Sequence, residues 1–518
     1  MDKTRRDFIK QAALFSMAAA NTSLLVVKAS AAQTKLKLSE FASFDGLGLA
    51  ELVRKKQVSP LELVEDALRH VERLNPKLNA VLPKLFDIEK ARDRARRGAG
   101  EGRFAGVPTM LKNLIAYKDA SITNGSRMFA RLIEKNGKAA KVSSPLVEAM
   151  EQAGMIITGV TSSPEMGLID TTEPVLYGAS RNPWNPAYTT GGSSGGTAAA
   201  VAAGFVPFAH ASDGGGSIRI PASQCGVFGL KPSRNRELGN SPSRGGGLEV
   251  LNISSNLCLS RSVRDTAAFL SVVENKNIAN LPAVGFVSAP SKKRLKIALV
   301  TQALNGKAPD PEVQNAITST AKLCDRLGHK IEEAKLDLNG EAFIDGFIGL
   351  WASGTVEYEK MVAEWFGKDA KPEDYLEPWT LGLAELAKRR GVQNCWQKAI
   401  QEFTAATTVL EKMFQSYDVI LSPVLRLPPY KLGHHSPTVE FNTLMSRVLD
   451  TVGYTPLHNA AGTTAMSVPL YWTATGLPIG SQFAAWRGGE ATLLQLAYEL
   501  EAARPWTKKR PPIYAGKF

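Results

Sequence analysis

One stretch of the chain, residues 191–222, constrains the fold more than any other. It begins GGSSGG, continues with the alanine-rich run TAAAVAAGFVPFAH, and ends SDGGGSIRIPA. A glycine- and serine-rich run on its own is typical of a flexible linker. Here the run leads directly into a segment that reads as a buried helix and strand, so we expect the glycines to lie inside a domain. A phosphate-binding loop is a second interpretation, but the run lacks the Lys-Ser/Thr ending of that motif.

The pattern around this stretch predicts an α/β fold. Short apolar runs alternate with glycine-rich turns and alanine-rich helices, which is typical of strands alternating with helices. The chain has 518 residues and is 44% hydrophobic, which excludes a disordered protein and a disulfide-held miniprotein. The expected strands lie at residues 107–111, 155–160, 227–230, 295–300, 418–421, 465–470 and 479–483.

Several helices carry clear boundary signals. Ser59 and Glu62 form a capping box with Pro60 at the first helical position. Asn75 and Pro76 are expected to end that helix. Further helices are expected at residues 311–327, 340–415 (mostly helical) and 490–502, and a linker-like stretch at 280–294.

The first 31 residues are predicted to be an export signal. Residues 4–10, TRRDFIK, match the twin-arginine signal, an apolar stretch follows at 12–27, and Ala29-Ser30-Ala31 forms a small-residue cleavage site. A membrane anchor is the alternative, but the run falls short of the ~20 strongly apolar residues that a span needs. We therefore expect the precursor to use the twin-arginine machinery. The mature protein is expected to carry no membrane span and to reside in the periplasm or outside the cell.

Charge and metal-ligand patterns exclude two classes of partner. Removal of residues 1–31 lowers the net charge from +13 to +10, because five basic and two acidic residues are lost. The only tight basic runs, at 292–294 and 508–510, are not interleaved with aromatic residues, so nucleic acid is not an expected partner. The four cysteines form no CxxC pair and the six histidines are scattered, so neither a metal nor another cofactor is expected.

The glycine loop of the 191–222 stretch suggests acyl-transfer chemistry. Gly214, Gly215 and Gly216 lack Cβ atoms, so their N–H groups can converge on one point beside a serine, as an oxyanion requires. Ser217 is then the candidate nucleophile, and its hydroxyl needs a base. No Gly-x-Ser-x-Gly elbow surrounds Ser217 and no histidine has an evident aspartate partner, so a lysine is the alternative base.

Residues 191–222 resemble the signature of the amidase signature family, and the resemblance extends over nearly all of the mature chain. FAGVP at 104–108 followed by Lys112 is similar to the family's lysine strand, and NPWNP at 182–186 and GLPIGSQF at 476–483 also match. The resemblance implies an α/β fold with a large mixed, twisted β-sheet covered by helices on both faces. Residues 32–518 would form the catalytic domain, with an N-terminal helical region at 32–100, a catalytic core at 101–280 and a helical insertion at 340–415.

The resemblance also implies the site residues. Ser217 corresponds to the acylated nucleophile, Ser193 to a bridging serine that follows a cis Gly192–Ser193 peptide bond, and Lys112 to the general base. Lys112 must be neutral to accept a proton, and burial lowers a lysine pKa. Asn113 favours this, because the family more often has an aspartate there, whose charge would stabilise the protonated lysine.

Supporting residues follow from the same resemblance. The oxyanion donors would be the backbone N–H groups of residues 214–217, although Gly214 stands where the family prefers Ile or Thr. Ser194 would hold the hydrogen-bond network, and Asp213 and Arg219 would brace the glycine loop.

The expected function is hydrolysis of a linear or cyclic carboxamide to an acid and an amine or ammonia through an acyl-enzyme. The substrate would be a small molecule with a carbon–nitrogen bond other than a peptide bond. SSPEMG at 162–167, TTEP at 171–174 and LEAARPW at 500–506 are similar to the 6-aminohexanoate cyclic-dimer hydrolase type.

Two other functions and the assembly state stay open. One is a periplasmic binding protein that keeps the fold without turnover, against which the intact Lys112, Ser193 and Ser217 argue. The other is an amidotransferase-like subunit for charged transfer RNA, against which export argues. A homodimer is one possible assembly.

Overall fold

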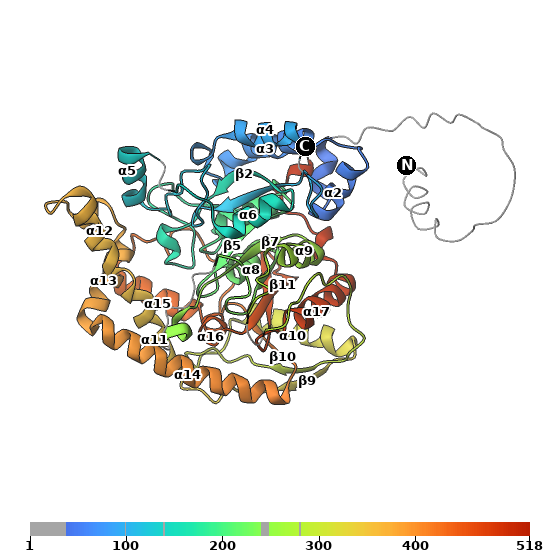
Figure 1. The fold of residues 1–518 in the computed structure, drawn as a ribbon. Helices are drawn as coiled ribbons and strands as arrows, with labels where there is room; N and C mark the ends of the chain where they lie inside the picture. Colours follow the sequence, from blue (N-terminus) through green and yellow to red (C-terminus); the bar gives the residue numbers. More distant parts are fainter. Residues whose placement is uncertain (1–37, 99, 138–139, 240–247, 279–280, 518) are drawn as a thin grey trace, which may run out of the picture. The chain divides into compact units, whose positions relative to one another are not determined.

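The computed structural model describes residues 38–98, 100–137, 140–239, 248–278 and 281–517 (Figure 1). The predicted signal peptide lies outside these residues. Within them, no helix is long and apolar enough to cross a membrane.

A mixed eight-stranded sheet lies at the centre of the described chain. Its strand order is β5-β7-β6-β11-β12-β10-β8-β9, with β8 parallel to both β10 and β9 and the other pairs antiparallel. This confirms the predicted α/β class. The bounds are β5 (Phe208–Asp213), β6 (Phe228–Lys231), β7 (Ser255–Ser260), β8 (Lys296–Leu299), β9 (Lys330–Glu333), β10 (Val419–Pro423), β11 (Thr464–Trp472) and β12 (Pro478–Ala485).

Helices cover both faces of this sheet. α8 (Arg219–Cys225) and α10 (Pro311–Arg326) pack on β11 and β12, while α9 (Val263–Val273) packs on β7 and meets α17 (Glu490–Ala503), which lies on β11 and β12. α7 (Gly195–Ala202) is buried along its whole length because it is almost entirely glycine and alanine, which lets it approach β5 and β7 closely. The run that could have been read as a linker is therefore in the core.

Two smaller strand pairs lie beside the main sheet. β1 (Pro108–Lys112) and β2 (Ile156–Thr161) form a parallel pair, and β3 (Arg181–Asn182) pairs with β4 (Asn185–Thr189). β1 packs on β5, where Thr109 donates a hydrogen bond to the carbonyl oxygen of Phe208 at 3.0 Å. This contact brings the end of β1 next to the glycine-rich stretch.

The N-terminal part of the described chain is helical. Its helices are α2 (Gly46–Arg54), α3 (Pro60–Leu78), α4 (Ile88–Arg97), α5 (Arg127–Asn136) and α6 (Pro145–Gln152). Ser59 and Glu62 form the predicted capping box on α3. The predicted end of this helix at Asn75–Pro76 is wrong, because α3 continues to Leu78. The Asn75 side chain stays in the helix and bonds the backbone of Ala80 and Val81, which ties down the turn after it.

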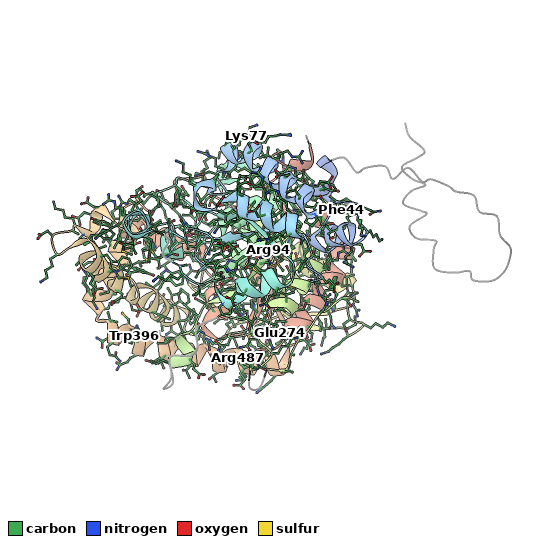
Figure 2. All side chains as sticks on the ribbon, turned by 45° about the horizontal axis from the view of Figure 1, so that its top comes forward. Phe44, Lys77, Arg94, Glu274, Trp396 and Arg487 are labelled. Carbon is green, nitrogen blue, oxygen red and sulfur yellow. The ribbon has the colours of Figure 1, made fainter. Side chains whose placement is uncertain are left out.

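The segment predicted as a helical insertion contains α11 (Gly340–Ser353), α12 (Val356–Phe366), α13 (Pro378–Arg390) and α14 (Val392–Ser416), which run from yellow to orange in Figure 1. α11 packs along α14 and α13. Trp396, labelled in Figure 2, donates its indole N–H from α14 to the hydroxyl of Ser353 on α11 at 2.9 Å. Two further helices, α15 (Phe441–Thr451) and α16 (Pro456–Ala460), follow β10.

The four cysteines, Cys225, Cys258, Cys324 and Cys395, are all buried and unpaired. They lie in α8, β7, α10 and α14. The fold is therefore held by packing and hydrogen bonds rather than by disulfides.

Candidate active site

Lys112 ends β1 and points its amine at two serines. The side chain is fully buried, and Nζ donates to Ser193 Oγ at 2.7 Å and to Ser212 Oγ at 2.9 Å. β1 provides Lys112, β5 provides Ser212, and the turn before α7 provides Ser193. The sequence predicted the contact between Lys112 and Ser193 but not the second hydroxyl. Ser212 stands in the same glycine-rich stretch, yet nothing local to it indicates a partner 100 residues away.

The surroundings of Lys112 lower its basicity. Burial lowers its pKa from 10.5 to about 7, although the negative charge of Asp213 acts in the opposite direction. The Asn113 side chain is occupied by hydrogen bonds with Thr123 and adds no charge. The histidine that accepts the Lys112 backbone N–H, His210, is itself held neutral, because burial and the lysine lower its pKa to about 3. A substantial fraction of Lys112 is therefore neutral near pH 7.

Ser193 is positioned by the glycine-rich turn between β4 and α7. The Gly192–Ser193 peptide bond is cis, as the family resemblance implies. Ser194, next along the chain, donates to the carbonyl oxygen of Ser212 at 3.2 Å, which joins this turn to the end of β5. Gly195 cannot carry a side chain, because a Cβ there would lie 2.2 Å from Thr190 Oγ1.

The predicted brace of the glycine loop is present. Asp213 Oδ1 accepts the Gly216 N–H at 2.8 Å, and Asp213 forms a two-point ion pair with Arg219 at 2.9 Å for each contact. Burial raises the pKa of Asp213, but the Arg219 guanidinium outweighs it and holds that pKa well below its usual range. This carboxylate therefore stays ionised and fixes the loop that precedes Ser217.

One of the predicted oxyanion donors has another partner. The Gly216 N–H is directed at Asp213, and this corrects the expectation that it faces the reacting carbonyl. Among the residues that the structure describes, the N–H groups of Gly214, Gly215 and Ser217 have no acceptor. Gly216 has a φ of +139°, and a Cβ there would lie 2.4 Å from Thr455 Oγ1, so glycine is required for the turn.

A second brace comes from distant parts of the chain. Asn459 on α16 accepts from Arg219 Nη2 at 2.6 Å and donates to Asp213 Oδ1 at 2.9 Å. Thr455 Oγ1 donates to the Gly215 carbonyl oxygen at 2.6 Å, and Gln482 on β12 accepts from Arg219 at 2.8 Å. Gln482 lies in the GLPIGSQF match, but no sequence signal indicated Thr455 or Asn459.

Ser217 lies on the wall of a pocket. The residue keeps a small exposed fraction, 8%, and it shares the pocket wall with Gly215. In the described part of the chain, no hydrogen bond joins Ser217 to Ser193. The structure thus brings Lys112 and Ser193 into direct contact and places Ser217 at the end of the glycine loop, open to a ligand.

The pocket is apolar and has a cavity volume of about 70 Å³. Its walls come mainly from the insertion and α15: Phe343, Phe347, Trp351, Trp379, Val448 and Leu449. The rings of Phe347 and Trp351 also lie against the glycine loop, 3.2 Å from where Cβ atoms on Gly215 and Gly214 would be. This arrangement suits the hydrocarbon part of a small molecule bound next to the Ser217 hydroxyl.

Comparison with known proteins identifies the relatives of this chain. The family model for amidases matches residues 62–494. AmiC of Mycobacterium tuberculosis is 37% identical over 479 residues, covering 91% of this chain and 97% of AmiC. A 6-aminohexanoate-cyclic-dimer hydrolase of Pseudomonas sp. (strain NK87) is 33% identical, covering 90% of this chain and 96% of that enzyme.

Solved structures agree with the sequence relatives. The structure of a 6-aminohexanoate cyclic dimer hydrolase bound to its substrate superposes with a TM-score of 0.82 at 31% identity, covering 91% of this chain and 99% of that one. A bacterial aryl acylamidase of the amidase signature enzymes gives a TM-score of 0.80 at 26% identity, covering 90% and 97% of the two chains.

Proposed function

The chain belongs to the amidase family and hydrolyses carboxamides, and from this premise we propose that Lys112, Ser193 and Ser217 carry out the reaction. The contact of 2.7 Å between Lys112 Nζ and Ser193 Oγ carries the proposal, because it joins a fully buried amine to a hydroxyl. The lowered pKa of Lys112, about 7, supports its role as the base. Ser217, on the pocket wall, is the group that a substrate carbonyl can approach.

The reaction begins with a proton relay. Neutral Lys112 takes the proton of Ser193, Ser193 takes the proton of Ser217, and Ser217 Oγ forms a bond to the amide carbon. The carbonyl π electrons move to oxygen, and the N–H groups of Gly214, Gly215 and Ser217 stabilise the resulting oxyanion. Ser193 then gives its proton to the leaving nitrogen as the carbon–nitrogen bond breaks, and it regains a proton from the Lys112 ammonium.

Water completes the cycle. The relay removes a proton from a water molecule, whose oxygen attacks the acyl-enzyme carbon. The ester bond to Ser217 then breaks and its oxygen regains a proton, so that the carboxylic acid leaves. Asp213 takes no proton in this cycle because its ion pair with Arg219 keeps it ionised.

The nucleophile assignment is tested by covalent labelling. A fluorophosphonate probe should label the wild-type protein, and Ser217→Ala should abolish both labelling and amide hydrolysis. Ser271→Ala is the matched control, because that serine donates only to a carbonyl oxygen within α9. Equal labelling of wild type and Ser217→Ala would reject Ser217 as the nucleophile.

We propose further that the substrate is of the 6-aminohexanoate cyclic-dimer type. The proposal is supported by the 31% identity and TM-score of 0.82 with such an enzyme, together with the apolar pocket next to Ser217. The purified protein should open the ring of the 6-aminohexanoate cyclic dimer. Absence of ring opening alongside turnover of simple aryl or alkyl amides would reject this substrate and keep the amidase activity.

We also propose that the protein is exported by the twin-arginine pathway to the periplasm or beyond. The proposal is supported by the TRRDFIK motif at residues 4–10 and the small-residue site at 29–31. A full-length precursor should appear shortened in the periplasmic fraction, and replacement of Arg5 and Arg6 by lysine should retain it in the cytoplasm. Unchanged export of that variant would contradict the assignment.

A further inference from the structure

The apolar pocket beside Ser217 contains one carboxylate. Asp170 is the single ionisable side chain among the described residues that line it. The Asp170 side chain is 4% exposed and is in contact with the His435 imidazole. Among the described residues, no lysine or arginine forms an ion pair with it. A buried carboxylate next to hydrocarbon walls is costly unless a cation or hydrogen-bond donors stabilise it.

Two neighbours fix the orientation of this carboxylate. His435 Nδ1 lies 2.9 Å from Asp170 Oδ1 and 3.1 Å from Oδ2, and the Tyr430 hydroxyl donates to Oδ2 at 3.1 Å. Both neighbours belong to the segment between β10 and α15, and their rings lie 4.1 Å apart, so they support each other. An ionised carboxylate offers about four acceptor positions, so these donors leave room for another.

The imidazole of His435 contains a polar atom without a partner. His435 is fully buried, and its Nε2 has no hydrogen-bond partner among the residues that the structure describes. Buried polar atoms are nearly always paired in native proteins. Nε2 lies on the far side of the ring from the Nδ1 that contacts Asp170, and His435 does not line the pocket, so the case for a ligand rests on the Asp170 carboxylate.

We infer that Asp170 determines specificity by accepting a primary ammonium group at the end of an apolar chain of the substrate. The inference rests on the proposed amide hydrolysis at Ser217 and goes beyond it, because it adds linear amides with a terminal ammonium group to the uncharged cyclic dimer as substrates. The aromatic and aliphatic walls contact the methylene groups of the chain, and Asp170 pairs with the terminal cation through charge-assisted hydrogen bonds. A chain that ends in a carboxylate is repelled, and one that ends in a methyl group forms no ion pair with Asp170.

Matched substrates separate this inference from the proposed function. 6-Aminohexanoyl p-nitroanilide and heptanoyl p-nitroanilide have the same length and differ by an ammonium or a methyl group at the end. We expect wild-type kcat/KM to be at least tenfold higher for the ammonium substrate, mainly through a lower KM. N-(6-aminohexyl)benzamide and N-heptylbenzamide repeat the comparison on the amine side of the amide.

Asp170→Asn keeps the shape of the side chain and removes its charge. We expect it to abolish the preference for ammonium, so that kcat/KM becomes equal for the two substrates of each pair. Glu173→Gln is the control, because Glu173 is a buried carboxylate that accepts hydrogen bonds from Thr171 and Gly433 but does not line the pocket. It should keep the wild-type preference.

The inference can also be tested on the wild-type protein alone, so the test does not depend on whether the Asp170 variant folds. Hexylammonium should inhibit hydrolysis of heptanoyl p-nitroanilide competitively, and hexanoate should inhibit at least tenfold less. The inference is overturned if both ions inhibit equally, if neither substrate pair shows a preference, or if Asp170→Asn lowers kcat/KM equally for both substrates of each pair. Failure of the proposed function looks different, because then neither pair is hydrolysed and Ser217→Ala labels like wild type.

Discussion

The chemistry of the site depends on how one lysine is surrounded. Lys112 contacts two hydroxyl groups, a neutral histidine packs against its backbone, and the nearest ionised acid, Asp213, is already paired with Arg219. Each of these arrangements avoids placing an unmatched negative charge against the amine. Burial can therefore lower the pKa of Lys112 into the neutral range.

This environment predicts a defined pH dependence of catalysis. Because the neutral amine is the active form, kcat/KM should fall about tenfold for each pH unit below 7 and level off above it. Heptanoyl p-nitroanilide is a suitable substrate for this measurement because it carries no titrating group. Lys112→Met should lower kcat by several orders of magnitude at every pH. A flat profile between pH 5 and pH 9 in the wild type would remove Lys112 as the base.

The limits of sequence-based prediction are clear at the same scale. Lys112, Ser193 and Ser217 could be identified because each belongs to a dense local motif. Asp170 and Asn459 could not be identified, because their roles arise from contacts with residues more than 200 positions away. The role of Gly216 was mistaken because its N–H direction depends on the Asp213 rotamer, which no pattern encodes.

At the scale of elements, two helices of the insertion share one acceptor in the core. Trp351 on α11 and Trp379 on α13 both donate their indole N–H to the carbonyl oxygen of Leu168, each at 2.9 Å. Leu168 follows the short 3₁₀ helix at Glu165–Gly167 and lines the pocket with both tryptophans. The helices of this segment were expected from the sequence, but this attachment was not, because tryptophan spacing alone does not distinguish packing from hydrogen bonding.

The shared acceptor predicts non-additive substitutions. Trp351→Phe and Trp379→Phe should each lower the free energy of unfolding by about 1 kcal/mol, because the other indole still satisfies Leu168. The double variant should lose about 1 kcal/mol more than the sum, because the carbonyl is then left without a protein donor. Urea unfolding of the four proteins measures this coupling. Strict additivity would show that the two hydrogen bonds are independent.

At the scale of the whole molecule, a pair of buried acids joins the core to the insertion. The Glu165 carboxylate accepts the Glu377 N–H at 2.8 Å and the Thr380 hydroxyl at 2.6 Å, and the Glu377 carboxylate accepts the Val175 N–H at 2.7 Å. Burial raises the pKa of Glu377 to about 8, and the negative charge of Glu165 adds to this effect. The attachment of the insertion is thus strongest when Glu377 is protonated.

The raised pKa of Glu377 predicts that the stability of the folded protein decreases as the pH rises. Because the folded-state pKa lies above the unfolded value of 4.5, the folded protein binds more protons between pH 4.5 and about 8. The contribution of Glu377 to stability is complete below that window and is lost as the pH rises through it. Glu377→Gln should therefore raise Tm relative to wild type at pH 8 and leave it unchanged at pH 4.

Thermal unfolding across this pH range provides the measurement. Glu341→Gln is the control, since it removes an exposed acid of the same insertion and should leave the pH dependence of Tm unaltered. Parallel curves for wild type and Glu377→Gln would contradict the assignment of this acid pair.

The burial of all four cysteines has a practical consequence for following the motions of this protein. Only a thiolate reacts with alkylating reagents, and burial raises the pKa of each of these thiols. Each thiol therefore becomes modifiable only when its own element opens, at α8, β7, α10 or α14. The order in which iodoacetamide labels the four sites, followed by mass spectrometry, would map which part of the native enzyme opens first.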